Sequence, residues 1–219
     1  MPAAELKSDL LGRVERGAWQ GDGGRVPAVR RSVADCPAWT RFFARRLLAR
    51  EARALAALAE VPALADRVPR LLHRSRDELV RSFLDGRPMQ EARPSDAAYF
   101  SAARRLLVAL HRAGVTHNDD AKEPNWLVTP SGAPALVDFQ LAGLSRHRGK
   151  LFRVLAREDL RHLLKHKRTY RPEALTPRER ALLARPSGGA RFLRTLAKPV
   201  YNFTTRRLLN WQDREGRGP

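Results

Sequence analysis

Apolar side chains recur every three or four positions along two long stretches of the chain, residues 41–60 and 95–113. Both stretches are rich in Ala, Leu and Arg, which favour helices, so the pattern predicts two long helices. Ser95 or Asp96 can cap the second helix, and Gly114 ends it. Helical periodicity returns at 151–168, 177–185 and 190–211, the last with a break at Pro199.

Short apolar runs bounded by turn residues predict strands elsewhere in the chain. The stretch 10–31 contains two such runs around a Gly-Asp-Gly-Gly turn at 21–24. Residues 78–84 alternate apolar and polar side chains and stop at an Asp-Gly pair, which favours a strand over a helix. Further runs lie at 68–72, 126–128 and 135–137, the last two joined into a hairpin by the turn 129–132.

The order of these elements predicts an α+β protein with two unequal lobes. A small β-rich lobe with one long helix is expected over residues 1–84. A mostly helical lobe that carries the hairpin is expected over residues 85–219. Hydrophobic residues make up 43% of the chain and charged residues 30%, which is typical of a globular protein and excludes a disordered one.

The sequence contains one cysteine, Cys36, which excludes a disulfide framework and a metal site built from several cysteines. No apolar run reaches the roughly 18 residues that a membrane span needs. The N-terminal residues carry early acids and lack the apolar stretch of a secretory signal. We therefore expect a cytoplasmic protein.

The chain is strongly basic, with 42 Lys and Arg against 23 Asp and Glu. Residues 139–219 alone hold 20 basic and 6 acidic side chains, a net charge of +14. Such a field attracts RNA, anionic lipid or phosphorylated glycans, while solvated surface arginines would give the same count. For residues 190–211 two interpretations stay open, an interfacial helix on an anionic inner membrane and a helix pair with its apolar face packed inward.

Polar side chains gather around the predicted hairpin. Asp119 and Asp120 precede it, Asn125 enters its first strand, and Asp138 ends its second strand. Because a hairpin brings its two ends together, Asn125 and Asp138 can face a common point, and their oxygens suit Mg²⁺. A separate carboxylate can then orient the proton of an attacking hydroxyl, while Lys122 neutralises charge on a transferring phosphoryl group.

These residues resemble two motifs of the protein-kinase superfamily. The run Thr-His-Asn-Asp-Asp-Ala-Lys-Glu-Pro-Asn at 116–125 is similar to the catalytic loop H-x-D-x-x-x-x-N. The run Leu-Val-Asp-Phe-Gln-Leu-Ala at 136–142 is similar to the D-F-G segment. Upstream, residues 50–55 resemble the αC helix, and residues 79–89 resemble the fifth strand and the hinge. Together the motifs predict a two-lobed kinase-like fold.

The resemblance implies a role for each matching residue. Asp119 would orient the acceptor hydroxyl, and Lys122 would stabilise the transferring charge. Asn125 and Asp138 would hold Mg²⁺. ATP would lie between the lobes, with its adenine on backbone groups near Phe83 and Leu84. Arg30 stands where the third strand of a kinase carries its lysine, and Glu51 would be the carboxylate that pairs with it.

The stretch after the D-F-G-like segment indicates which kinases the chain resembles most. Only a short connection precedes the next predicted helix, with no A-P-E motif and no long activation loop. This resembles the RIO-type atypical kinases and the bacterial lipopolysaccharide-core sugar kinases, and Lys7-Ser8-Asp9 is similar to the RIO nucleotide loop. The resemblance implies an ATP- and Mg²⁺-dependent phosphotransferase acting on a protein Ser or Thr, or alternatively on a lipopolysaccharide-core sugar. A nucleotide-binding pseudokinase or scaffold on an anionic surface, and a nucleic-acid binder, are further alternatives.

The chain departs from the kinase pattern at four points. Asp119 lies six positions before Asn125, where the usual spacing is five, so either Asp119 or Asp120 could be the catalytic acid. We favour Asp119, which keeps H-x-D, and expect Asp120 to be a solvated loop acid and His117 to be a scaffold residue. Arginine replaces the third-strand lysine, Gln140 replaces the D-F-G glycine, and residues 12–17 make a poor glycine-rich loop.

Overall fold

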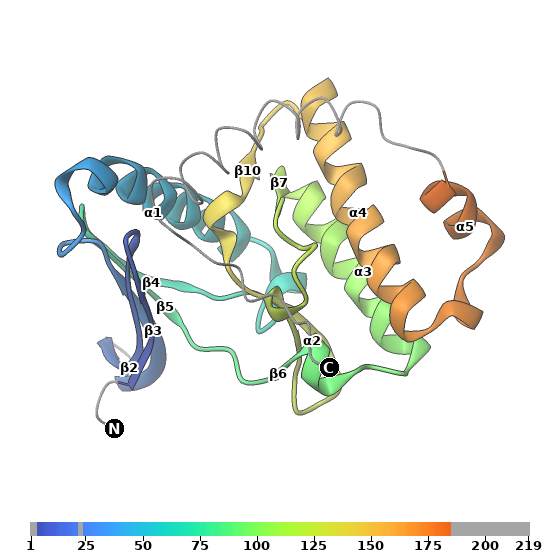
Figure 1. The fold of residues 1–219 in the computed structure, drawn as a ribbon, viewed down its shortest axis with the longest axis horizontal. Helices are drawn as coiled ribbons and strands as arrows, with labels where there is room; N and C mark the ends of the chain where they lie inside the picture. Colours follow the sequence, from blue (N-terminus) through green and yellow to red (C-terminus); the bar gives the residue numbers. More distant parts are fainter. Residues whose placement is uncertain (1–3, 22–23, 185–219) are drawn as a thin grey trace. The chain divides into compact units, whose positions relative to one another are not determined.

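A five-stranded antiparallel sheet forms the N-terminal part of the chain in the computed structural model, which describes residues 4–21 and 24–184 (Figure 1). The strand order is β1-β2-β3-β5-β4, and each neighbouring pair is antiparallel. The strands are β1 (Ala4–Asp9), β2 (Gly12–Gly21), β3 (Gly24–Ser32), β4 (Leu71–Arg74) and β5 (Glu78–Ser82).

The two strands expected within 10–31 are confirmed as β2 and β3, which pair from Arg13 opposite Ser32 to Gly21 opposite Gly24. The first strand, β1, was not predicted. Its sequence AELKSD is polar and mostly exposed, so it carries none of the apolar periodicity that marks a strand. Only Leu10 and Leu11 separate β1 from β2, so the turn at this edge of the sheet is very short.

One long helix, α1 (Ala38–Ala59), covers a face of this sheet. Its apolar face buries Ala44, Leu48 and Ala52 against Leu79 of β5 and against Val33, which directly follows β3. The helix therefore fixes which face of each strand is turned inward, and it carries Glu51 into the interior with 1% of its surface exposed.

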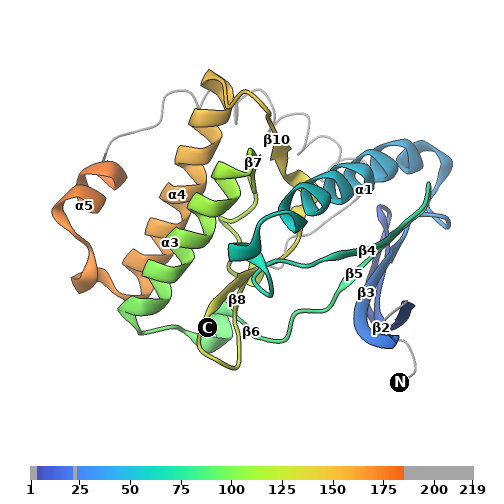
Figure 2. The same ribbon diagram turned by 180° about the vertical axis from the view of Figure 1, so that it is seen from behind.

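The rest of the described chain is mainly helical, with short strands between the helices. α3 begins after Asp96, whose carboxylate accepts a hydrogen bond from the Ala98 N–H at 2.8 Å, a helix cap. α3 and α4 lie side by side in both ribbon views (Figures 1 and 2). The helices are α2 (Met89–Ala92), α3 (Ala97–Arg112), α4 (Lys150–Tyr170) and α5 (Pro177–Ala184), and the strands are β6 (Arg87–Pro88), β7 (Val115–Thr116), β8 (Trp126–Val128), β9 (Pro134–Leu136) and β10 (Gly143–Leu144). Single 3-10 turns are η1 (Pro62–Leu64), η2 (Glu123–Asn125), η3 (Phe139–Leu141) and η4 (Pro172–Ala174).

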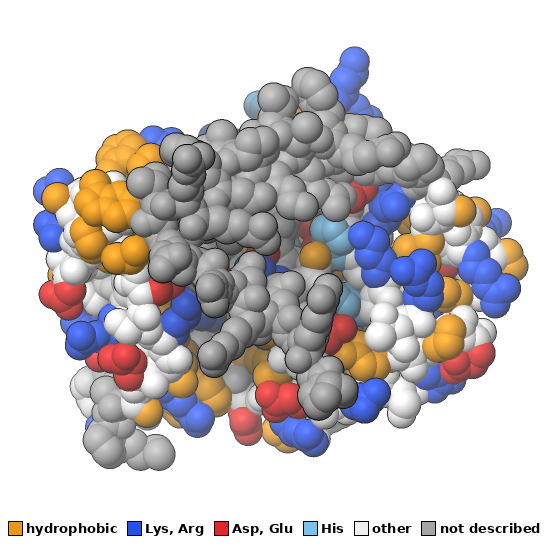
Figure 3. Space-filling model, in the orientation of Figure 1, with side chains coloured by type: hydrophobic (Ala, Val, Ile, Leu, Met, Phe, Trp, Pro, Cys, Tyr) orange, Lys and Arg blue, Asp and Glu red, His pale blue; other side chains and the backbone are white. Residues whose placement is uncertain are grey.

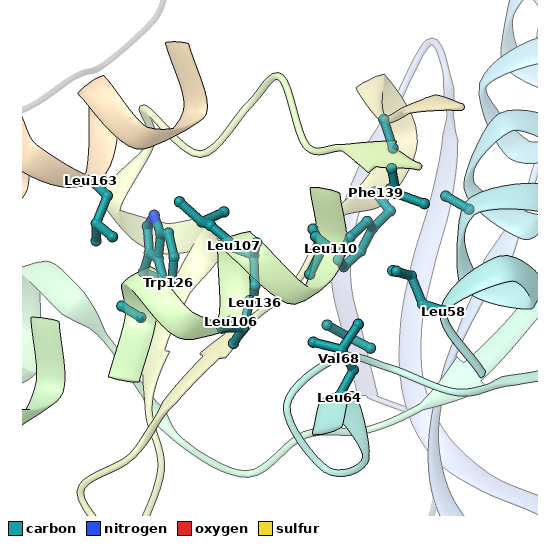
Figure 4. Packing of buried hydrophobic residues seen from close by; sticks show 14 of the residues in the cluster. Leu58, Leu64, Val68, Leu106, Leu107, Leu110, Trp126, Leu136, Phe139 and Leu163 are labelled. Atoms are coloured by element: carbon teal, nitrogen blue, oxygen red, sulfur yellow. The ribbon is translucent and has the colours of Figure 1, made fainter. Parts of the chain in front are cut away.

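A continuous hydrophobic core joins α1, α3, α4 and the β8–β9 hairpin, as Figure 4 shows. Trp126 and Phe139, which flank the hairpin, are both fully buried within it. Because these two rings lie directly beside Asn125 and Asp138 in the sequence, their burial fixes the positions of the neighbouring polar residues. The polar loop is therefore held on the surface of a rigid core.

The predicted α+β class and the kinase-like order of elements are confirmed. All described residues fall within one compact unit, residues 1–185. The division into lobes at 1–84 and 85–219 stays a prediction, and the helix expected at 190–211 lies outside the described residues. Among residues 4–21 and 24–184, no helix has the length and apolar character needed to cross a membrane.

Candidate active site

The loop between β7 and η2 is held by one buried carboxylate from α4. Asp159 Oδ2 accepts the backbone N–H of His117 at 2.9 Å, and its Oδ1 accepts the N–H of Asn118 at 3.0 Å. His111 Nε2 lies 3.0 Å from Oδ2 as well. Asp159 is fully buried, so these contacts are shielded from water and fix the start of the loop.

Asp119 lies at the centre of a small polar network. Its Oδ2 contacts Lys122 Nζ at 3.1 Å and accepts a hydrogen bond from Asn125 Nδ2, also at 3.1 Å. The same Asn125 amide donates to the Asp119 carbonyl at 2.9 Å. Partial burial raises the pKa of Asp119, the positive charge of Lys122 lowers it, and the negative charge of Asp138 raises it further. The structure thus brings Asp119, Lys122 and Asn125 together.

Asp138 faces this network from the far end of the hairpin. The Val137 N–H donates to the Asn125 carbonyl at 2.9 Å, which joins the two ends of the hairpin as expected. Asp138 has φ 66° and ψ 72°, a left-handed conformation that is rare for a residue with a side chain. Its Oδ1 is buried and has no hydrogen-bond partner among the described residues. Such an atom is costly unless a ligand satisfies it.

His117 supports the loop without entering the site. Its ring is fully buried and packs edge-on against Phe139, with ring centres 4.8 Å apart. Nε2 lies 2.9 Å from the Val137 carbonyl, and Nδ1 accepts the Asp119 N–H at 3.3 Å. Burial lowers the pKa of His117, so the ring is neutral and can donate at Nε2 while accepting at Nδ1. This agrees with the scaffold role expected for it.

The pairing of Glu51 with Arg30 that the sequence predicted is wrong. Arg30 Nη2 instead donates to Glu78 Oε2 at 2.7 Å, and its Nη1 lies 3.8 Å from Glu15 Oε2. Glu51 Oε1 lies 3.3 Å from Arg81 Nε of β5. Burial raises the pKa of Glu51, Arg81 lowers it, and the charge of Asp138 raises it again.

A shift of one position along β3 explains this error. Arg31 pairs with Leu79 across the sheet, and Leu79 packs against α1, so Arg31 points to the α1 face of the sheet. Arg30 is its neighbour and points to the opposite face, where it is exposed. Arg31 is 6% exposed, and its charge also lowers the pKa of Glu51. Arg31 and Arg81 are the cations that sequence reasoning missed, although the alternation of each strand contained the signal.

Asp120 is buried, and the expectation of a solvated loop acid was wrong. His162 Nδ1 of α4 lies 2.9 Å from its Oδ1, and its backbone carbonyl accepts from Trp126 Nε1 at 2.9 Å. Burial and the nearby charge of Asp159 raise the pKa of Asp120 well above its usual value. Of the two candidate acids, Asp119 therefore joins the Lys122–Asn125 network, while Asp120 lies against α4.

The segment expected to bind adenine follows β5. The Phe83 N–H donates to the Pro27 carbonyl at 3.0 Å, so this donor is already used within the protein. The Arg16 guanidinium lies over the Phe83 ring, 3.8 Å from its centre. The expected adenine contact at Phe83 and Leu84 stays a prediction.

Two surface hollows lie away from the loop and hairpin that carry Asp119, Asn125 and Asp138. One of about 350 Å³ is on the outer face of the sheet beside Trp19, Arg30 and Glu78, and one of about 610 Å³ is lined by η1 and α3. Neither is lined by Asp119, Asn125 or Asp138, so we assign the site from the chemistry of its side chains. Within residues 4–21 and 24–184 there is no group of three or more His, Cys, Asp and Glu suited to a metal ion.

Comparison with known proteins places the fold. No family model matches the chain, and no curated protein matches it. The solved structure of Rio2 kinase from Chaetomium thermophilum is similar, with a TM-score of 0.57 and 17% identity over 81% of this chain and 60% of that one. Its complex with ADP/Mg²⁺ and phosphoaspartate gives the same score and identity over 83% and 59%.

The chain thus spans about 60% of the length of the Rio2 structures it resembles. At this level of identity the likeness concerns the fold alone. We conclude that this chain has a protein-kinase-like fold similar to that of Rio2 kinase.

Proposed function

We propose that the chain is an ATP- and Mg²⁺-dependent phosphotransferase of the RIO-like kinase type, which transfers the γ-phosphate to a Ser or Thr hydroxyl of a protein. The observation that carries this proposal is the network of Asp119, Lys122 and Asn125 opposite Asp138, whose buried Oδ1 lacks a partner among the described residues. A buried acceptor without a partner is costly, and a bound ligand at Asp138 would satisfy it.

The donor set suits magnesium. Asn125 uses its Nδ2 hydrogens on Asp119, which leaves its amide oxygen as a ligand. With Asp138 this makes one amide and one carboxylate oxygen, and Mg²⁺ commonly takes one or two protein oxygens and completes its shell with water and phosphate. The ion would neutralise charge on the phosphates during transfer. One of the similar Rio2 structures is a complex with ADP/Mg²⁺, which supports the assignment.

Each residue of the network has a defined role in the step. Both contacts of Asp119 use Oδ2, and we assign Oδ1 to the acceptor hydroxyl, whose proton it receives. The hydroxyl oxygen forms a bond to the γ-phosphorus while the bond to the bridging oxygen breaks and ADP leaves. Lys122 stabilises the equatorial oxygens as charge develops on them.

The positively charged side chain that contacts the ATP phosphates is proposed to be one other than Arg30. Arg30 points away from Glu51, so we assign its role to Arg81 and Arg31, which both act on Glu51 beneath the sheet. A guanidinium in this place is always charged and can contact two phosphate oxygens at once. Arg81→Lys keeps the charge but loses the bidentate contact, so it should lower turnover. Arg30→Lys should leave turnover unchanged.

The test is phosphate transfer from γ-labelled ATP to proteins of a fractionated lysate, with lipopolysaccharide-core sugar as a second acceptor. Asp119→Asn and Asp138→Asn should abolish transfer, while Asp96→Asn, the same change at a helix cap, should retain it. Because one Rio2 complex contains phosphoaspartate, hydroxylamine treatment separates acyl phosphate from phosphoserine. Equal transfer by the wild type and both site variants would refute the assignment.

A nucleotide-binding scaffold is the second candidate. The observation in its favour is the two-residue turn between β1 and β2, which leaves no glycine-rich loop to cover phosphates. Isothermal titration with ATP and Mg²⁺ distinguishes the two proposals. Binding that depends on Asp138, without transfer by the wild type, would support the scaffold over the enzyme.

A further inference from the structure

Three aromatic side chains at the start of α1 point away from the protein. Trp39 is 52% exposed, Phe42 is 59% exposed and Phe43 is 56% exposed. They make no part of either hydrophobic cluster. Burying rings of this size is strongly favourable, so a protein seldom leaves three of them together in water without a use.

The same side of α1 continues in arginines. With 100° between successive residues, Arg46, Arg50 and Arg53 fall in one stripe with the three rings, and all three are exposed. The Phe42 and Phe43 rings pack edge to face at 5.6 Å, and the Arg46 guanidinium lies 5.5 Å from the centre of the Phe42 ring. Figure 3 shows hydrophobic and basic side chains gathered over the region of α1. We call these six residues the aromatic–arginine stripe.

The charge of the aromatic–arginine stripe has one sign. The only acid within α1 is Glu51, which is buried on the opposite side of the helix. Two other arginines of α1 are occupied, because Arg45 pairs with Asp77 and Arg41 donates to the Cys36 carbonyl. The stripe is therefore an aromatic patch followed along the helix by a cationic one.

We infer that the aromatic–arginine stripe docks on an anionic membrane surface. Trp and Phe rings enter the boundary between headgroups and acyl chains, and arginine stems extend along apolar surface while their charges meet lipid phosphates. A helix lying flat on the bilayer would present rings and guanidinium groups at the same depth. This contact does not depend on the proposed function, and it differs from any attraction by the basic residues beyond 139, because it requires apolar insertion.

The test uses the full-length protein and vesicles of phosphatidylcholine, alone or mixed with phosphatidylglycerol. Phe42→Ser/Phe43→Ser should weaken partition into the mixed vesicles at least about tenfold, given the ring area withdrawn from water. Leu144→Ser/Leu151→Ser is the matched control, because these residues are equally exposed, at 52% and 56%, and it should bind as the wild type does. Charge outside α1 acts alike on both variants and cancels in the comparison.

A second readout reports the depth of insertion. Lipids brominated on their acyl chains should quench part of the tryptophan fluorescence, and Trp39→Phe should remove that part. Unchanged thermal unfolding of each variant shows that its fold is intact. The inference is overturned if the wild type ignores the mixed vesicles, or if Phe42→Ser/Phe43→Ser binds them equally. A concentration-dependent dimer that this variant abolishes, without vesicle binding, would overturn it in favour of self-association.

Discussion

Asp159 fixes the loop that carries Asp119, and Asp159→Asn is the substitution that examines this most directly. The carboxylate accepts two backbone N–H groups and lies against His111 while fully buried. An asparagine has the same shape, but one of its two terminal atoms is an NH₂ that cannot accept. One of the backbone N–H groups of His117 and Asn118 must then lose its partner inside the protein.

The magnitude can be worked from these contacts. A hydrogen bond to a charged group is worth about 1.5–3 kcal/mol, and a buried donor left without a partner costs about 1–3 kcal/mol. We expect a net loss of about 2–4 kcal/mol, a large share of the roughly 5–15 kcal/mol that stabilises a typical domain.

Urea unfolding of the full-length protein measures this loss as a shift of the midpoint at constant slope. Asp96→Asn is the control, since asparagine caps a helix as well as aspartate does, and it should change stability by under about 0.5 kcal/mol. Hydrogen exchange should show faster exchange at the His117 and Asn118 amides. A stability within about 0.5 kcal/mol of the wild type, or unchanged protection of both amides, would refute the reasoning.

Three further outcomes are expected at buried positions. The raised pKa of Asp120 means that its contribution to stability is present below its ordinary value of 3.8 and is lost as the pH rises through the raised value. The melting temperature of Asp120→Asn, relative to that of the wild type, should therefore increase as the pH rises from 5 to 8. A difference between the two melting temperatures that stays constant over this pH range would contradict the reasoning. Gly114 and Gly132 share φ 76°, but a Cβ at Gly114 would lie 2.6 Å from the Ser145 carbonyl and one at Gly132 would meet nothing; Gly114→Ala should thus cost at least about 1 kcal/mol more than Gly132→Ala in urea unfolding, and equal costs would count against the close contact. Burial raises the pKa of the Cys36 thiol, so iodoacetamide should label it only after unfolding, as intact mass will show, whereas rapid labelling of the native protein would disprove its protection.

Local periodicity was sufficient to predict most of the fold. The helices at 41–60 and 95–113 and the hairpin strands were found because a half-buried element must repeat its apolar residues at a fixed interval. β1 was not predicted because, as an edge strand, it is polar on both faces. Helix ends shifted by a few residues, since caps and neighbouring packing decide them.

The site was harder to predict because its supports come from distant parts of the chain. Asp159 and His162 lie about forty residues beyond the loop that they hold, and nothing in the local sequence marks them. The burial of Asp120 depends on that same helix. Arg30 and Arg31 are adjacent and chemically identical, so only the pairing of β3 with β5 decides which one faces Glu51.

At Asp138 the backbone conformation favours glycine, whereas the proposed chemistry requires a carboxylate. A left-handed conformation costs a residue with a Cβ about 1–2 kcal/mol, and glycine would adopt it freely. A library of variants selected for thermal resistance alone should accordingly accumulate glycine at position 138, and those survivors should be inert. Under the proposed function, position 138 would then be a site where the protein gives up stability to keep its carboxylate, so that heat resistance and the proposed phosphate transfer cannot both be maximised in one sequence.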